Sequence, residues 1–239
     1  MLVDLLLDPF GARWADMAAA AQAAETAGYS GIWTWDHLSG VVHGAPHVLE
    51  CWTALTAIAA TVPRLNVGSL VLNVANRDVG TLAVMAATLQ QVSGGRLILG
   101  LGAGGGRATP YAYEQELFGR PVLGDGARRH AVEDTVTALR TSWSGEHGLL
   151  APDPPPPIII GGFGPKTISL AARVADGVNV PVGLLDLAHE ARRAHPDPDR
   201  FLVTAFTGFH RRWLDQAAPL PGVDRLILLV SPPYRDVTG

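Results

Sequence analysis

Short runs of leucine and β-branched residues recur along the chain, separated by longer polar and alanine-rich stretches. Eight of these runs have the length of strands and are apolar almost throughout: residues 3–7, 31–35, 66–72, 97–102, 158–162, 178–182, 201–207 and 225–230. A strand that is apolar on both faces is covered on both faces, which is typical of a parallel sheet packed between helices.

Between most of these runs, apolar residues return every three or four positions, which is the period of an amphipathic helix. The segments with this period are residues 14–24, 48–59, 82–92, 132–143, 168–174 and 184–194. Eight strands that alternate with helices favour a closed α/β barrel over an open sheet. We therefore predict that residues 1–239 form one (β/α)8 TIM-barrel domain.

The expected barrel departs from regularity in two places. The connection 103–157, after the fourth strand, is much longer than the others and includes a helix, a glycine cluster and the run PDPPPP. Such excursions are often lids or substrate loops, although a proline run can also be a stiff spacer. A short helix is expected at 211–218, and only SPPYRDVTG follows the eighth strand. We therefore expect no eighth helix, a barrel shortened at its carboxyl end, and a second subunit that covers the exposed wall in a homodimer.

Composition narrows the range of partners and locations. The net charge is −4 with acids and arginines interspersed, so the sequence has no electrostatic footprint for nucleic acid, and a small-molecule substrate is the expected partner. No apolar run approaches the roughly 18 residues that cross a membrane. The single cysteine, Cys51, excludes an internal disulfide, and the amino end lacks the basic region of a signal peptide. A cytoplasmic location is expected.

The only lysine of the chain, Lys166, lies in the segment IIIGGFGPKT at 158–167. This segment reads as a buried strand, a Gly-Gly turn and the start of a helix, with Pro165 at the first helical position. Backbone amides and the positive end of the helix dipole attract an anion there, usually a phosphate. The alternative is that Lys166 is a solvated residue, although a cation in the first turn opposes the dipole.

In a barrel, the residues that follow each strand share one mouth and build the site. The richest of these junctions is Trp35-Asp36-His37, because an imidazole exchanges protons near neutral pH and a nearby carboxylate can orient it. We predict His37 and Asp36 as the catalytic residues; the alternative is a structural histidine that caps the next helix. The other acid at a strand end is Asp8, and this scarcity of acids disfavours hydrolysis by paired carboxylates.

Three other chemistries fit the sequence poorly. The GxGxxG pattern at 100–105 follows three earlier strand–helix units and does not open a helix directly, which argues against a dinucleotide fold. Cys51 falls inside a predicted helix without an evident base, and no GxSxG is present, so acyl transfer is not supported. His43 and His47 lie on an irregular loop without a ligand at a strand end, and no metal is expected.

Four segments resemble the luciferase-like flavin family, in particular its branch that uses the deazaflavin coenzyme F420. They are GYSGIWTWDHL (28–38), NRDVGTLAVMAATLQQVSGGRLILGLGAG (76–104), RRHAVEDTVTALRTSW (128–143) and PPIIIGGFGPKTISLAARVADGVN (156–179). The resemblance implies a (β/α)8 barrel with the coenzyme ring in its mouth. It implies that the coenzyme phosphate is held by Gly161, Gly162, Gly164, Lys166 and Thr167.

The same resemblance implies the surroundings of the ring. Asp36 and His37 would face the ring and the substrate, and Asn73 would lie near a bulge where a strained peptide, assigned to Leu70–Val71, supports the ring. Gly102, Ala103 and Gly104 would lie beside it. Sugar-phosphate dehydrogenases of the family carry a glutamate where this chain has Gly105, which argues against a sugar phosphate as substrate.

We therefore expect an oxidoreductase that transfers a hydride between coenzyme F420 and an organic substrate, with His37 exchanging the proton and Asp36 tuning it. Two alternatives remain: a monooxygenase that uses FMNH2, and a non-catalytic flavin-binding protein of the same fold. The residues that choose the substrate would lie in the connection 103–157, which matches no motif.

Overall fold

The structure, a computed structural model, describes residues 1–210 and 220–238. The first half of its sheet consists of β1 (Leu2–Leu7), β2 (Gly31–Thr34), β3 (Asn66–Ser69), β4 (Leu72–Asn73) and β5 (Leu97–Gly102). The second half consists of β6 (Ile158–Gly161), β7 (Gly177–Pro181), β8 (Leu202–Gly208) and β9 (Arg225–Val230). All neighbours are parallel, β1 pairs with β9, and β3 pairs with β5, so that the sheet closes on itself.

The predicted barrel is thereby confirmed, with one difference in the third strand. The run expected at 66–72 is divided into β3 and β4, which together fill one of the eight positions in the barrel. The division falls at Leu70–Val71, whose peptide bond is cis. This is the bond that the resemblance singled out.

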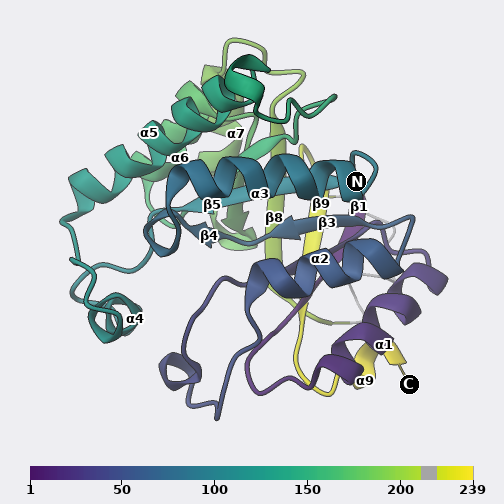
Figure 1. Ribbon diagram of the computed structural model, residues 1–239. Helices are drawn as coiled ribbons and strands as arrows, with labels where there is room; N and C mark the ends of the chain where they lie inside the picture. Colours follow the sequence, from purple (N-terminus) through teal and green to yellow (C-terminus); the bar gives the residue numbers. More distant parts are fainter. Residues whose placement is uncertain (211–219, 239) are drawn as a thin grey trace.

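Helices cover the outside of the barrel (Figure 1). They are α1 (Trp14–Thr26), α2 (Cys51–Thr61), α3 (Val79–Val92), α4 (Ala112–Leu117), α5 (Asp125–Ser142), α6 (Pro165–Val174), α7 (Leu185–Ala194) and α9 (Arg235–Thr238). The long connection after the fourth strand position contains both α4 and α5, and α4 lies apart from the other helices in Figure 1. The helix expected at 211–218 lies outside the described residues.

Two expectations about these helices are wrong. Helix α2 begins at Cys51 rather than at Val48, because the side chain of Glu50 accepts hydrogen bonds from the Trp52 and Thr53 amides and caps the helix. The segment after the last strand is not without helix, since it forms α9, which contacts α1 and is preceded by the fully buried Tyr234. The tyrosine hydroxyl donates to the Asp8 carbonyl oxygen at 2.7 Å.

We also expect an exposed apolar wall at the last strand, which a second subunit would cover. The described residues of β9 do not form such a wall. Leu226, Leu228 and Val230 of β9 belong to the layer between barrel and helices and are at most 1% exposed. This wall therefore gives no support for a covering subunit, and the homodimer stays a prediction.

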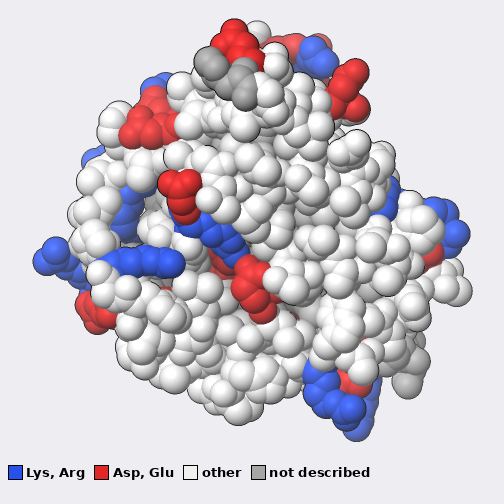
Figure 2. All heavy atoms as spheres, viewed as in Figure 1, with Lys and Arg blue, Asp and Glu red and all other residues white. Residues whose placement is uncertain are grey.

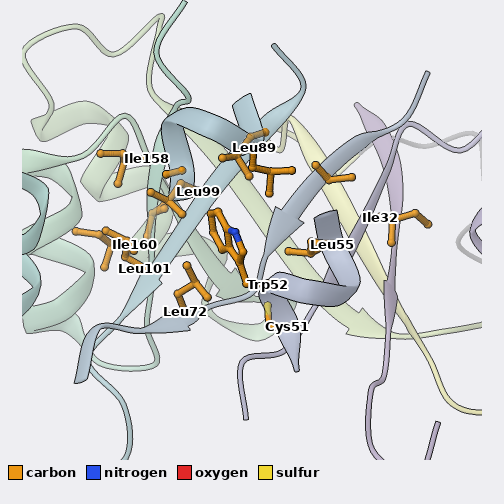
Figure 3. Close-up of a cluster of buried hydrophobic side chains, with 14 of the residues drawn as sticks. Ile32, Cys51, Trp52, Leu55, Leu72, Leu89, Leu99, Leu101, Ile158 and Ile160 are labelled. Carbon is orange, nitrogen blue, oxygen red and sulfur yellow. The ribbon is translucent and has the colours of Figure 1, made fainter. Parts of the chain in front are cut away.

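The core has an inner and an outer layer. Inside the barrel, Leu6, Trp33, Ile98, Ile159 and Ile227 pack together. The larger outer layer lies between barrel and helices, and Figure 3 shows the indole of Trp52 from α2 among side chains of β4 and β5. No helix in the described residues is both long and apolar enough to span a bilayer.

Candidate active site

A cavity of about 810 Å³ opens at the carboxyl ends of the strands. It is lined by every residue to which the sequence assigned a role: Asp36, His37, Leu70, Val71, Asn73, Gly102, Ala103, Gly104, Gly161, Gly162, Gly164, Lys166 and Thr167. The structure thus brings these residues together, while their individual roles stay predictions. In the surface view of Figure 2, a hollow bordered by basic side chains lies near the amino end of α5, on a face where charges of both signs are otherwise interspersed.

The side chain of Val71 explains why glycines end the neighbouring strands. A Cβ atom on Gly161 would lie 2.6 Å from Val71 Cγ1, and one on Gly102 would lie closer than 3.0 Å to Cγ2. Gly104 has a φ of +65°, and a Cβ there would lie 2.5 Å from Oδ1 of Asn73. Glycines therefore let β5 and β6 approach the Leu70–Val71 segment and form the floor of the cavity.

The amino end of α6 is one candidate anion site. Gly164 is the N-cap residue and offers no side chain to the helix amides, Pro165 occupies the first helical position as predicted, and the first turn holds no acid. Lys166 follows Pro165 and is exposed on the cavity wall. A helix end without a side-chain cap leaves its partial positive charge available to a ligand.

The amino end of α5 adds two cations to the same wall, Arg128 and Arg129. Arg128 donates to the carbonyl oxygens of Ala103, at 3.1 Å, and Gly104, and it pairs with Asp125 at 2.8 Å. Its Nε is buried and has no hydrogen-bond partner among the described residues. The hydrogen bond and charge of Arg128, with a contribution from Lys166, lower the pKa of Asp125. Sequence reasoning missed both arginines because they lie on a helix that no strand-end rule selects.

The carboxylate of Asp36 is bound by three neighbouring residues. Arg77 binds it with both terminal nitrogens, at 2.8 and 2.9 Å, and Asn73 donates its backbone amide at 2.9 Å. Asn76 adds a side-chain hydrogen bond at 3.2 Å, and Asp36 is 4% exposed. Arg77 also pairs with Glu50. The carboxylate therefore ties the end of β2 to β4 and, through Arg77 and Glu50, to the start of α2. Among the described residues, no hydrogen bond joins it to the imidazole of His37.

The acid that contacts His37 is Glu114, from α4. Its carboxylate lies 3.1 Å from Nδ1 of His37 and accepts hydrogen bonds from the amides of Leu38, at 2.8 Å, and Ser39, at 3.1 Å. Burial acts to raise the pKa of Glu114, but the hydrogen bond and charge of His37 and the two amides outweigh it, and the pKa lies below its usual value. The sequence predicted that acids would be scarce at the site. Glu114, from the long connection 103–157, adds one, and no local sequence pattern predicts its position.

The remaining polar candidates have other roles. His43 lines the cavity, whereas Nε2 of His47 lies 3.0 Å from the Ala12 carbonyl oxygen, away from it. Cys51 is the first residue of α2 rather than an interior one, and burial raises its pKa well above the usual value, which keeps it a thiol. Within the described residues, no three side chains of the metal-ligating kinds are grouped for an ion.

Known proteins with related sequences cover much of the chain. It is 26% identical over 214 residues to 5,10-methylenetetrahydromethanopterin reductase from Methanolobus tindarius, which covers 81% of this chain and 60% of that protein. It is 29% identical over 178 residues to an F420-dependent glucose-6-phosphate dehydrogenase from Beutenbergia cavernae, which covers 68% of this chain and 51% of that protein. The chain spans between about half and three fifths of the length of these relatives.

Solved structures show the same fold, and a family model covers most of it. An F420-dependent secondary alcohol dehydrogenase in complex with an F420-acetone adduct is similar with a TM-score of 0.75 and 19% identity, over 87% of this chain and 68% of that one. Apo-MsnO8 is similar with a TM-score of 0.71 and 15% identity, over 96% of this chain and 92% of that one. The model for luciferase-like monooxygenases matches residues 5–209. The chain therefore belongs to the luciferase-like monooxygenase family.

Proposed function

We propose that the chain is an oxidoreductase that transfers a hydride between coenzyme F420 and an organic substrate. One observation carries the proposal: a single cavity has the uncapped amino end of α6 and three cations at one end, and elsewhere an imidazole in contact with a buried carboxylate. The first suits a phosphorylated coenzyme and the second suits proton exchange with a substrate.

The residues present fit a phosphate. Lys166, Arg128 and Arg129 supply three cations, and Asp125 offsets one of them, which leaves an excess of positive charge at this end. The unpartnered Nε of Arg128 is a buried donor, and a buried donor without an acceptor is unfavourable until a ligand supplies one. In this proposal the first turn of α6, with Gly164, Lys166 and Thr167, would hold the phosphate, and Val71 and the glycines of the floor would hold the ring.

The coenzyme supplies the hydride chemistry, and the protein supplies position and the proton. Because Nδ1 of His37 contacts the Glu114 carboxylate, it carries the hydrogen, and Nε2 is the nitrogen left for the cavity. Nε2 then takes the hydroxyl proton when an alcohol is oxidised and returns a proton to oxygen when a carbonyl is reduced. Asp36 acts by holding the backbone of Asn73.

The relatives support F420 over FMN. Several curated relatives are named for F420, whereas the solved structures of similar fold also include flavin-dependent proteins such as a riboflavin lyase with modified FMN. The proposal therefore predicts that purified protein binds F420 more tightly than FMN. Titration of each coenzyme, followed by its absorbance and fluorescence, measures both dissociation constants. Tighter binding of FMN would instead favour the flavin monooxygenase.

Substitution of Lys166 tests the phosphate site. We expect Lys166→Ala to weaken coenzyme binding by about 1–3 kcal/mol, the range for a charge-assisted hydrogen bond. Arg173→Ala is the matched control, because Arg173 lies in the last turn of the same helix and pairs with Glu133 at the surface. Equal affinity of the Lys166→Ala and Arg173→Ala proteins would make Lys166 a solvated residue and would contradict the proposed site.

Substitution of His37 separates an enzyme from a carrier. We expect His37→Gln to keep coenzyme affinity and to lower turnover by about 100-fold or more, since positioned proton transfer contributes about 10²–10⁴-fold. Glu114→Gln keeps a partner for Nδ1 but removes the charge, and it should lower turnover less than His37→Gln. Full turnover in the His37→Gln protein would contradict the proton-transfer role. A wild-type protein that binds the coenzyme but turns over neither alcohols nor carbonyl compounds of any class would be a flavin-binding protein.

A further inference from the structure

We propose that the part of the cavity beside His37 takes an uncharged carbonyl compound or alcohol with a flat, apolar body, such as an aryl ketone. The inference rests on the proposed function and adds the substrate class to it. It is carried by a group of rings that we call the aromatic wall: Trp35, His37, His43 and Tyr111, all of which line the cavity.

The rings of the aromatic wall contact one another. His43 stacks on Trp35 with centroids 5.7 Å apart, and Tyr111 lies 5.4 Å from His37 and 5.9 Å from His43. Phe10 backs the wall at 5.0 Å from His37 and 4.2 Å from His43. A surface of contiguous rings binds flat apolar groups through burial and through stacked or edge-to-face contacts. The proton-exchanging imidazole is itself one of these rings.

Among residues 1–210 and 220–238, no charged side chain without a charged or hydrogen-bonding partner lies on this part of the cavity. The cations that line the cavity, Arg128, Arg129 and Lys166, all come from the first turns of α5 and α6. Glu114 lines the cavity beside the wall, but His37 and two backbone amides occupy its carboxylate. A charged substrate group would therefore lose its water here without gaining an opposite charge, which is unfavourable for either sign.

The groups behind the wall do not change this balance. Burial raises the pKa of Asp8, although the Phe10 amide and the neighbouring imidazoles act against it, and its carboxylate accepts the Phe10 amide at 3.0 Å. Burial and the proximity of His37 lower the pKa of His43, which favours its neutral form. The wall therefore presents aromatic rings to a ligand, and the neutral form of His43 is favoured.

The position of Tyr111 leaves no room for a side chain at residue 105, just after the fourth strand position. A Cβ atom on Gly105 would lie 2.6 Å from Thr109 Oγ1 and closer than 3.0 Å to Tyr111 Cβ. An acidic side chain at 105 and the observed course of residues 109–111 are therefore incompatible. Where a glutamate would bring a negative charge into the cavity, this chain brings a phenol ring.

The reaction that this wall suits is balanced by the groups already named. The carbonyl carbon would receive a hydride from the reduced coenzyme, the carbonyl π bond would break, and the oxygen would take a proton from Nε2 of His37 in its imidazolium form, while Nδ1 keeps its hydrogen on Glu114. The coenzyme is thereby oxidised and the ketone is reduced to a secondary alcohol. In the opposite direction, the same nitrogen accepts the hydroxyl proton.

Three ketones of similar shape and different charge test the inference: acetophenone, the anion phenylglyoxylate and the cation 4-(trimethylammonio)acetophenone. Their binding to coenzyme-loaded protein is measured by saturation-transfer NMR and calorimetry, and their reduction by the spectrum of the coenzyme. We expect acetophenone to bind at least about tenfold more tightly than either charged ketone, because a charge would have to be desolvated without a partner. A charged ketone that binds as tightly as acetophenone would overturn the inference.

Tyr111 and Tyr113 provide a matched pair of variants. They are 39% and 40% exposed on the same segment, but only Tyr111 lines the cavity. Tyr111→Ala should weaken acetophenone binding about three- to tenfold, Tyr111→Phe should retain it, and Tyr113→Ala should leave it unchanged. Coenzyme affinity should be the same in all three variants.

The two levels of the proposal fail in different ways. If the wild-type protein binds neither F420 nor FMN, the proposed function fails and takes this inference with it. If the coenzyme binds but Tyr111→Ala and Tyr113→Ala affect acetophenone equally, the inference fails and the proposed function stands.

Discussion

At the scale of single residues, the contacts of Asp36 favour a structural role over the catalytic role that its residue type suggests. Its carboxylate is 4% exposed and receives both terminal nitrogens of Arg77 and the amide of Asn73. These contacts, with a further hydrogen bond from Asn76, fix the carboxylate in place. We therefore infer that Asp36 keeps the mouth of the barrel in shape, and that its effect on His37 is indirect.

Substitution of Asp36 should consequently reduce stability. Asp36→Asn leaves Arg77, whose side chain is 12% exposed, with Glu50 as its one charged partner within the described part of the chain. We expect the free energy of unfolding to fall by about 2–4 kcal/mol, because a buried charge loses most of its compensation. Urea denaturation measures this fall. Glu133→Gln removes the partner of the exposed Arg173 and should cost less than about 1 kcal/mol. A stable Asp36→Asn protein without turnover would instead indicate a direct catalytic role.

At the scale of elements, the sequence predicts those strands and helix ends that residues close together along the chain determine. Apolar period, glycine and proline predict the eight barrel positions, and Pro165 predicts the start of α6. The contact between His37 and Glu114 joins residues 77 positions apart, so no local pattern announces it. The same holds for Arg128, which reaches the cavity only because α5 begins beside α6. The predicted lining residues lie at the ends of strands or in the first turn of α6, and the missed Glu114, Arg128 and Arg129 lie on α4 and α5.

The floor of the cavity offers a prediction about how elements fit. Gly102→Ala would place a methyl group against Val71, and we expect it to destabilise the protein by about 1–3 kcal/mol, the usual effect of overpacking. Val71→Ala in the same chain should restore part of this loss. Thermal unfolding of the single and double variants measures both effects. Gly183→Ala is the control, since a Cβ there meets nothing within 4 Å. Equal losses from Gly102→Ala and Gly183→Ala would contradict the proposed close fit.

At the scale of the whole molecule, the two ends of the barrel have different tasks. The cavity lies at the carboxyl ends of the strands, and a buried polar network lies at the amino ends. There, Arg225 binds both carboxylate oxygens of Asp4, at 3.0 and 2.9 Å, and the Asn66 side chain at 2.7 Å. Trp33 donates its indole N–H to Asp4 at 2.8 Å. The network joins β1, β2, β3 and β9, and so it closes the first strand against the last.

This division predicts a variant that loses stability with a characteristic pH dependence and keeps its site. Arg225→Met leaves Asp4, which is 0% exposed, without its cation, and we expect a loss of about 3–5 kcal/mol at neutral pH. Burial already raises the pKa of Asp4 despite Arg225, and removal of the guanidinium raises it further. A carboxyl whose pKa is higher in the folded state than in the unfolded state binds a proton on folding, so its folded form gains stability as pH falls towards about 4.

The difference in urea midpoint between wild type and Arg225→Met should therefore be smaller at pH 5 than at pH 8. Coenzyme affinity, measured where both proteins are folded, should be equal. A difference that is the same at both pH values would show that Asp4 remains ionised without Arg225, and altered coenzyme affinity would show that the two ends of the barrel are coupled.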